Sequence, residues 1–127
     1  MNANQKIEAA LSELVDGNIW PLSKPEESNP DNWITYNPEI DLPGDFGDDT
    51  PLEWVQHFQI HWFKKGVANY LKTRKIMRKL LVLAGFSISD ITCLKEGKRE
   101  SASSGEYTHL IFSCSIIEDG FYGEIES

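Results

Sequence analysis

The sequence is poor in cysteine and has no long hydrophobic run. Its 127 residues include two cysteines, Cys93 and Cys114, which are too few for a disulfide-stapled scaffold or a four-thiolate zinc site. The longest apolar run, from Leu80 to Ala84, is far shorter than the roughly 18–20 residues that cross a bilayer. The first residues also lack the basic, apolar and small-residue pattern of a secretory signal. We therefore expect partly buried thiols in a reducing compartment and no membrane contact.

The chain has enough apolar material to bury one core. Apolar residues make up 40% of the sequence and aromatic residues 11%, which excludes a wholly disordered chain. A length of 127 residues suits one domain, covering residues 1–127, because single cores usually take roughly 100–200 residues.

Charge is distributed unevenly within a formal net charge of −8. Residues 1–63 have two basic and twelve acidic side chains. Residues 64–100 have ten basic and three acidic side chains, and residues 101–127 have no basic and five acidic side chains. The excess of acid argues against nucleic-acid binding by the molecule as a whole, because phosphates repel most of its surface. Separate acidic and basic surfaces are well suited to joining copies, or a neighbouring protein, head to tail.

Two segments have the spacing of amphipathic helices. In the first, apolar residues stand at i, i+3, i+4 and i+7, namely Ile7, Ala10, Leu11 and Leu14. Gly17 follows as a stop signal. The second covers residues 67–84, has an apolar stripe opposite a row of cations, and is closed by Gly85.

Extended segments account for most of the remaining chain. They are the short piece Asn18–Pro21, Trp33–Asn37 closed by Pro38, Trp54–Phe63, Phe86–Leu94 and Tyr107–Ile117. The predicted order is α-β-β-β-α-β-β. Because hairpins favour antiparallel pairing, the sequence predicts an α+β fold in which two amphipathic helices pack on one face of an antiparallel sheet of about four strands.

Three polar segments are predicted to lie outside these elements. They are an acidic loop at 38–53, a flexible hairpin tip at 95–105 and an acidic tail at 118–127. The first is long for a compact domain, and such loops are usually functional or mobile. The paired acids Asp48-Asp49, and Glu26-Glu27 in an earlier loop, are better explained as solvated loop residues than as catalytic carboxylates, which must be held rigidly across a cleft.

Signatures of catalysis are missing. The sequence has no Gly-x-Ser-x-Gly elbow and no glycine-rich phosphate loop. His57 and His61 are four residues apart, which in a strand is about 13 Å and too far to share a metal ion. His109 could lie beside either of them, but no cysteine or acid is spaced to complete a site. We therefore expect no enzymatic activity, no cofactor and no metal, and interpret these histidines as ordinary side chains on the wetter face of the sheet.

The second helix has an unusual polar face. Its cations are Lys72, Arg74, Lys75, Arg78 and Lys79, and no acid occurs from residue 64 to residue 89. A solvated face usually mixes glutamate with lysine, so an all-basic face favours contact with an acidic partner, either nucleic acid or the acidic loops of another copy. Simple solvation is the alternative.

The order of short motifs along the chain has a counterpart in a known family. The motifs are Leu-Val-Asp-Gly at 14–17, Ile19-Trp20-Pro21, Trp33-Ile34-Thr35-Tyr36, the strand 55–62, the helix end Ala84-Gly85-Phe86 and the strand 107–114. Over residues 5–118 this pattern resembles the tail terminator, or tail completion, proteins of long-tailed bacteriophages and prophages. The acidic loop 38–53 is longer than the family pattern has at that place.

The resemblance implies an α+β fold and a structural role in the virion. Members of that family form rings, often of six copies, which cap the tail tube and join it to the head connector, with DNA passing only as cargo. It implies assembly in the bacterial cytoplasm and a final place in the tail or neck. We expect the basic helix face and the acids Asp45, Asp48 and Asp49 to contact neighbouring subunits, tail or connector proteins. The alternatives are a small nucleic-acid-binding module that uses helix 67–84 and, third, an enzyme with an unfamiliar site around the histidines.

Overall fold

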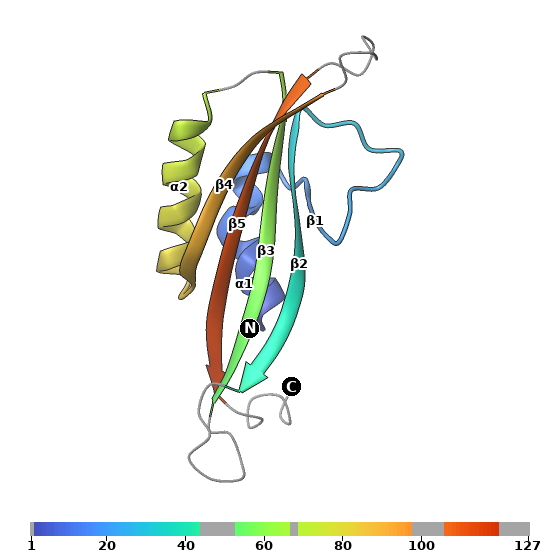
Figure 1. Ribbon diagram of the computed structural model, residues 1–127. Coiled ribbons are helices and arrows are strands. Elements are labelled where there is room, and N and C mark those ends of the chain that lie inside the picture. The colour runs from blue at the N-terminus through green and yellow to red at the C-terminus, as the bar shows by residue number, and fades with distance from the viewer. Residues whose placement is uncertain (1, 44–52, 67–68, 98–105, 120–127) are drawn as a thin grey trace.

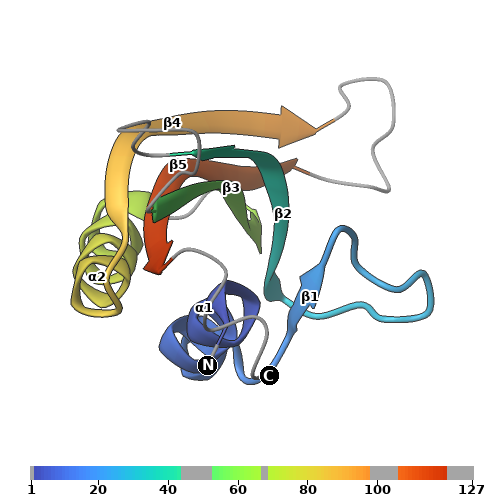
Figure 2. The same cartoon turned by 90° about the horizontal axis from the view of Figure 1, so that it is seen from below.

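The computed structural model describes residues 2–43, 53–66, 69–97 and 106–119. In chain order its elements are α1 (Ala3–Leu11), the 3₁₀ helix η1 (Ser12–Val15), β1 (Ile19–Pro21), β2 (Asn32–Pro43), β3 (Glu53–Lys65), α2 (Tyr70–Leu83), β4 (Ser87–Gly97) and β5 (Glu106–Asp119). The strands form one sheet in the order β1-β2-β3-β5-β4. Both α-helices lie on the same side of it (Figures 1 and 2). The predicted α+β class is confirmed.

The sheet is mixed, so the prediction of a purely antiparallel sheet of about four strands is wrong. Five strands are present, and β1 pairs parallel with β2 through Ile19 and Ile34. The reason is the connection 22–31, which returns the chain to the end of the sheet where β1 began. A connection of this kind makes the two strands run in the same direction. The tight hairpins assumed from the sequence would make neighbouring strands run in opposite directions.

Strand β2 continues past Pro38, where the sequence predicted its end, to Pro43. Pro38 is paired with Phe58 of β3, and the register shifts between Pro38 and Asp41. On its other side β2 pairs with β1 only as far as Tyr36. Proline is therefore tolerated, because beyond Tyr36 that side of β2 has no strand partner among the described residues and needs no N–H. The predicted acidic loop 38–53 is shortened accordingly, and residues 44–52 lie outside the described residues.

The other element ends shift by a few residues. Helix α2 is shorter than the predicted 67–84, whereas β4 and β5 are longer than predicted and include residues 95–97 and 118–119. The first residues of the predicted tip 95–105 therefore belong to β4, and the first residues of the predicted tail 118–127 belong to β5. Residues 98–105 and 120–127 lie outside the described residues.

Local signals set the ends of the first helical segment. The side chain of Asn2 accepts a hydrogen bond from the backbone N–H of Gln5 (2.8 Å), and the Gln5 side chain accepts one from the N–H of Asn2 (2.9 Å). This reciprocal cap satisfies two N–H groups that the first turn leaves without partners. After η1 the chain turns through Asp16 and Gly17, which both have positive φ angles of 53° and 82°. The predicted stop at Gly17 is thus confirmed.

The core lies between the sheet and the two helices. Alternate residues of the central strands point into it, as the sequence pattern predicted: Phe58, Ile60 and Trp62 from β3, and Leu110, Phe112, Cys114 and Ile116 from β5. The helices contribute Ile7 and Leu11 from α1, and Met77 and Leu81 from α2. The opposite face of the sheet is covered by neither helix (Figure 2), and we call it the helix-free face.

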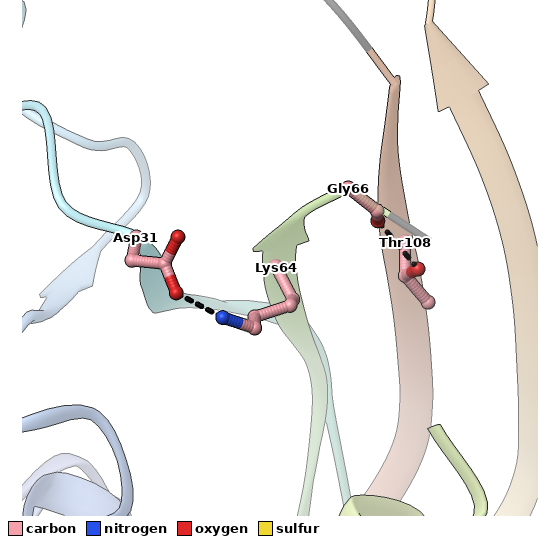
Figure 3. Close-up of polar contacts among 4 residues, drawn as sticks. All are labelled: Asp31, Lys64, Gly66 and Thr108. Atoms are coloured by element: carbon pink, nitrogen blue, oxygen red, sulfur yellow. Dashed lines mark hydrogen bonds and ion pairs between the residues drawn. The ribbon is translucent and has the colours of Figure 1, made fainter. Parts of the chain in front are cut away.

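The end of β3 that leads to α2 is fixed by two polar contacts (Figure 3). Lys64 forms an ion pair with Asp31, which precedes β2. The Thr108 hydroxyl of β5 donates a hydrogen bond to the carbonyl oxygen of Gly66 (3.1 Å). The backbone therefore leaves the sheet toward α2 from a defined position.

Tyr36 connects the sheet to α1, and its removal gives a first prediction. The buried phenol of Tyr36 donates a hydrogen bond to the carboxylate of Glu8. Tyr36→Phe removes this bond but keeps the ring in place, so we expect the free energy of unfolding to fall by roughly 1 kcal/mol at pH 7. Urea unfolding followed by circular dichroism measures this difference, and an unchanged midpoint would contradict it.

The same pair predicts a dependence on alkaline pH. Burial, and secondarily the neighbouring Glu8 carboxylate, raises the pKa of Tyr36 above its ordinary value of 10.0. The folded chain therefore holds this proton at a pH where the unfolded chain has lost it. The stability contributed by Tyr36 falls as pH rises above about 10. The difference in free energy of unfolding between wild type and Tyr36→Phe should therefore narrow between pH 9 and 11. A gap that stays constant would show that the phenol is not held in this way.

Cys114 gives a third prediction, on thiol reactivity. It lies in the core at 2% exposure, and burial, with a smaller contribution from Glu39, raises the pKa of its thiol to about 12. Because the thiolate is the reactive form, we expect Cys114 in a Cys93→Ser variant to react on the order of 100-fold more slowly in the native state than in 6 M urea. Mass spectrometry after maleimide labelling measures both rates, and rapid native labelling would contradict a closed core.

Candidate interaction surface

The cations predicted to contact a partner all lie on the exposed side of α2. The helix begins after Asn69, whose side chain accepts a hydrogen bond from the N–H of Leu71 (3.2 Å). It ends before Gly85, whose φ of 104° is favourable only for glycine. Five side chains on the surface away from the core form what we call the basic face: Lys72, Arg74, Lys75, Arg78 and Lys79, all exposed.

No ion pair joins the basic face to an acid among the described residues. The ion pair present in the described residues joins Lys64 to Asp31 instead, and α2 contains no Asp or Glu. Arg74 lies four residues before Arg78, and each such like-charge pair costs a helix about 0.2–0.5 kcal/mol. The row of cations therefore carries a small electrostatic cost in the isolated chain.

Part of the basic face borders a groove between α2 and β4. Arg74, Lys75 and Arg78 form one wall, and residues 88–91 of β4 form the other. The groove has a volume of about 460 Å³, and we call it the α2–β4 groove. Ile88 and Ile91 supply apolar surface that is partly buried against the core. Asp90 is the acid of the groove, and its carboxylate accepts a hydrogen bond from Thr92 (3.0 Å).

The sequence did not point to the β4 side of this groove. Residues 88–91 include no charged residue except Asp90, and their use depends on which strand lies next to α2, which no local pattern specifies. The predicted interface acids Asp45, Asp48 and Asp49 lie outside the described residues. The structure therefore brings Arg74, Lys75 and Arg78 together at one groove and places Lys72 and Lys79 on the same helix away from it.

Two of the three histidines meet on the helix-free face. His61 Nδ1 and His109 Nε2 are 2.8 Å apart, and His61 Nε2 is 3.2 Å from the side-chain oxygen of Gln59. At 2.8 Å one ring nitrogen donates a hydrogen bond to the other, and the tautomers decide which of the two is the donor. The sequence allowed a position for His109 beside His61, and strand pairing brings it there because His109 lies opposite Phe63, two residues along β3.

Aromatic rings enclose this pair. His109 stacks on Phe63 with ring centroids 4.2 Å apart, and Phe63 stacks on Trp33 at 5.1 Å. Tyr107 completes the cluster at 6.1 Å from Phe63. His109 is only 7% exposed, so this end of the helix-free face is less wet than the sequence predicted. Stacking of this kind stabilises the end of the sheet.

Other chemical groupings are limited in the described ranges. No three or more His, Cys, Asp or Glu residues there are arranged to hold a metal ion. Neither of the α-helices described is both long and apolar enough to cross a membrane. No protein-family model matches the chain, and no curated protein is significantly similar to it in sequence. The α2–β4 groove, with the basic face around it, is the most developed candidate site.

Proposed function

We propose that this protein is a structural, non-catalytic component whose copies join through oppositely charged surfaces into a ring, in the manner of the phage tail terminator proteins that its sequence pattern resembles. The observation that supports the proposal is the basic face. It is exposed on a helix that packs on the core, and it forms no ion pair with an acid among the described residues. The proposed partners of this face are acids of an adjacent subunit, including Asp45, Asp48 and Asp49, or acids of tail and connector proteins.

A contact between two different surfaces has consequences for assembly. Such a contact is heterologous: each copy uses its basic face toward one neighbour and its acidic surface toward the other. Repetition of the contact closes into a ring if the rotation between copies is a full turn divided by a whole number, with no shift along the axis. Otherwise it gives a filament. A tail-capping collar requires the closed form, and its proposed place is the neck or tail of a virion assembled in the bacterial cytoplasm.

The charge balance also suits a ring through which DNA passes. A net charge of −8 per copy repels phosphates over most of the surface, so DNA in the lumen would not adhere. Cations used in contacts between copies are removed from contact with the DNA. The proposal therefore treats DNA as cargo and not as a ligand.

Light scattering and negative-stain electron microscopy test the proposal on the full chain. We expect the mean mass to rise with protein concentration in 50 mM salt and rings to be visible at the highest concentration. We expect assembly to weaken in 500 mM salt, because the Debye length falls to below about 5 Å and screens exposed charges. A monomer at every concentration in low salt, or turnover of a substrate, would overturn the proposal.

A further inference from the structure

The α2–β4 groove combines three features that together favour an extended acidic peptide. Its side chains include three cations and a single acid, Asp90. Its floor includes Ile88 and Ile91, which offer apolar surface. Helical spacing places Leu71 and Val82, which are 54% and 53% exposed, on the same stripe of α2 as Lys75 and Arg78. A ligand that matches this groove carries carboxylates and apolar side chains close together.

The strand beside the groove has a free edge. Strand β4 is last in the sheet order, and β5 occupies one of its sides. The backbone groups on its other side have no strand partner in the described part of the chain, and such groups can pair with an added extended segment. The register shift between Ile88 and Asp90 bends this edge next to Arg74 and Arg78. An added segment would therefore be short and would lie against the cations.

The chain itself contains a segment of this chemistry. After the end of β5, residues 120–127 read Gly-Phe-Tyr-Gly-Glu-Ile-Glu-Ser, with two acids, three apolar residues and no base. We propose that the α2–β4 groove of one copy binds the segment 120–127 of a neighbouring copy, with its carboxylates on Arg74, Lys75 and Arg78 and its apolar side chains toward Ile88 and Ile91. This inference rests on the proposed function and specifies which contact joins the copies.

A peptide-binding experiment with the full chain tests this inference. The probe is a fluorescein-labelled peptide with the sequence of residues 120–127, and the readout is anisotropy at protein concentrations below self-association. We expect Arg74→Glu/Arg78→Glu to weaken binding by roughly tenfold or more. Lys72→Glu/Lys79→Glu carries the same charge change outside the groove and should weaken it by less than about threefold. Circular dichroism confirms that both variants fold.

Each other outcome has a definite meaning. Absence of peptide binding, equal weakening by the two double variants, or equal binding of a scrambled peptide would overturn the inference. Tighter binding of duplex DNA that displaces the peptide would also overturn it and make the groove a nucleic-acid site. Rings that form without peptide binding would remove this inference and retain the proposed function. Peptide binding without any assembly would overturn the proposed function and the role of a neighbouring copy, leaving a groove for acidic peptides.

Discussion

The Arg74→Glu/Arg78→Glu variant is expected to fold normally and to assemble at least about 100-fold more weakly than the wild-type chain, because like charges placed across an interface cost several kcal/mol. Both arginines are exposed and line the α2–β4 groove. Each can hold a carboxylate through two parallel hydrogen bonds, which lysine cannot do. Replacement by glutamate removes these bonds and places acid against acid.

The fold should tolerate this double change. Neither arginine belongs to the core, and exposed substitutions usually alter the free energy of unfolding by less than about 0.5 kcal/mol. The glutamate at position 78 can in addition pair with Lys75, three residues earlier, and the like-charge repulsion between positions 74 and 78 is the same in kind as that between the two arginines. We therefore expect the melting temperature to stay within about 3 °C of the wild type, so that any loss of assembly is a loss of contact and not of structure.

Light scattering over a range of concentrations measures the effect, and Lys72→Glu/Lys79→Glu is the matched control. Both double variants change the net charge by the same amount, but Lys72 and Lys79 do not line the groove. Exposed charges at the rim of an interface mainly change the association rate, so we expect the control to assemble within about fivefold of the wild type. Normal rings from Arg74→Glu/Arg78→Glu would dispose of the basic face as the interface.

The features that the sequence predicted well are those that depend on local periodicity. Alternation along β3 placed Phe58, Ile60 and Trp62 on one face, and the structure buries all three. Helical spacing and a closing glycine located α2 and its exposed cations in the same way. These predictions succeed because one face of each element is buried, and a shift by one residue would expose apolar side chains to water.

The features that the sequence did not predict depend on contacts between distant segments. The parallel pairing of β1 with β2 follows from where the connection 22–31 returns the chain, and no single residue marks that path. Extension of β2 beyond Pro38 depends on the short length of β1, which ends its pairing at Tyr36. The β4 side of the groove became a candidate only once the order of the strands placed β4 at the edge next to α2. Local patterns contain none of this information.

Two adjacent residues of β5 are expected to differ sharply in their contribution to stability. Leu110 faces the helices and is 0% exposed, whereas Ile111 is partly exposed on the helix-free face. Leu110→Ala leaves a cavity in the core and should lower the free energy of unfolding by about 3–4 kcal/mol. That is a large fraction of the roughly 5–15 kcal/mol that stabilises a domain. The side chain of Ile111 has the same number of carbon atoms, so Ile111→Ala is a matched control, for which we expect about 1 kcal/mol.

Urea unfolding of the isolated chain, in 500 mM salt to weaken assembly, gives both values. A small cost at Ile111 means that the helix-free face is not packed as a core at this position, and that the core between sheet and helices holds α2 in place. The groove and the basic face would then be presented by a rigid helix before any partner binds. Equal costs at the two positions would contradict this, because they would show that the helix-free face is packed as a second core.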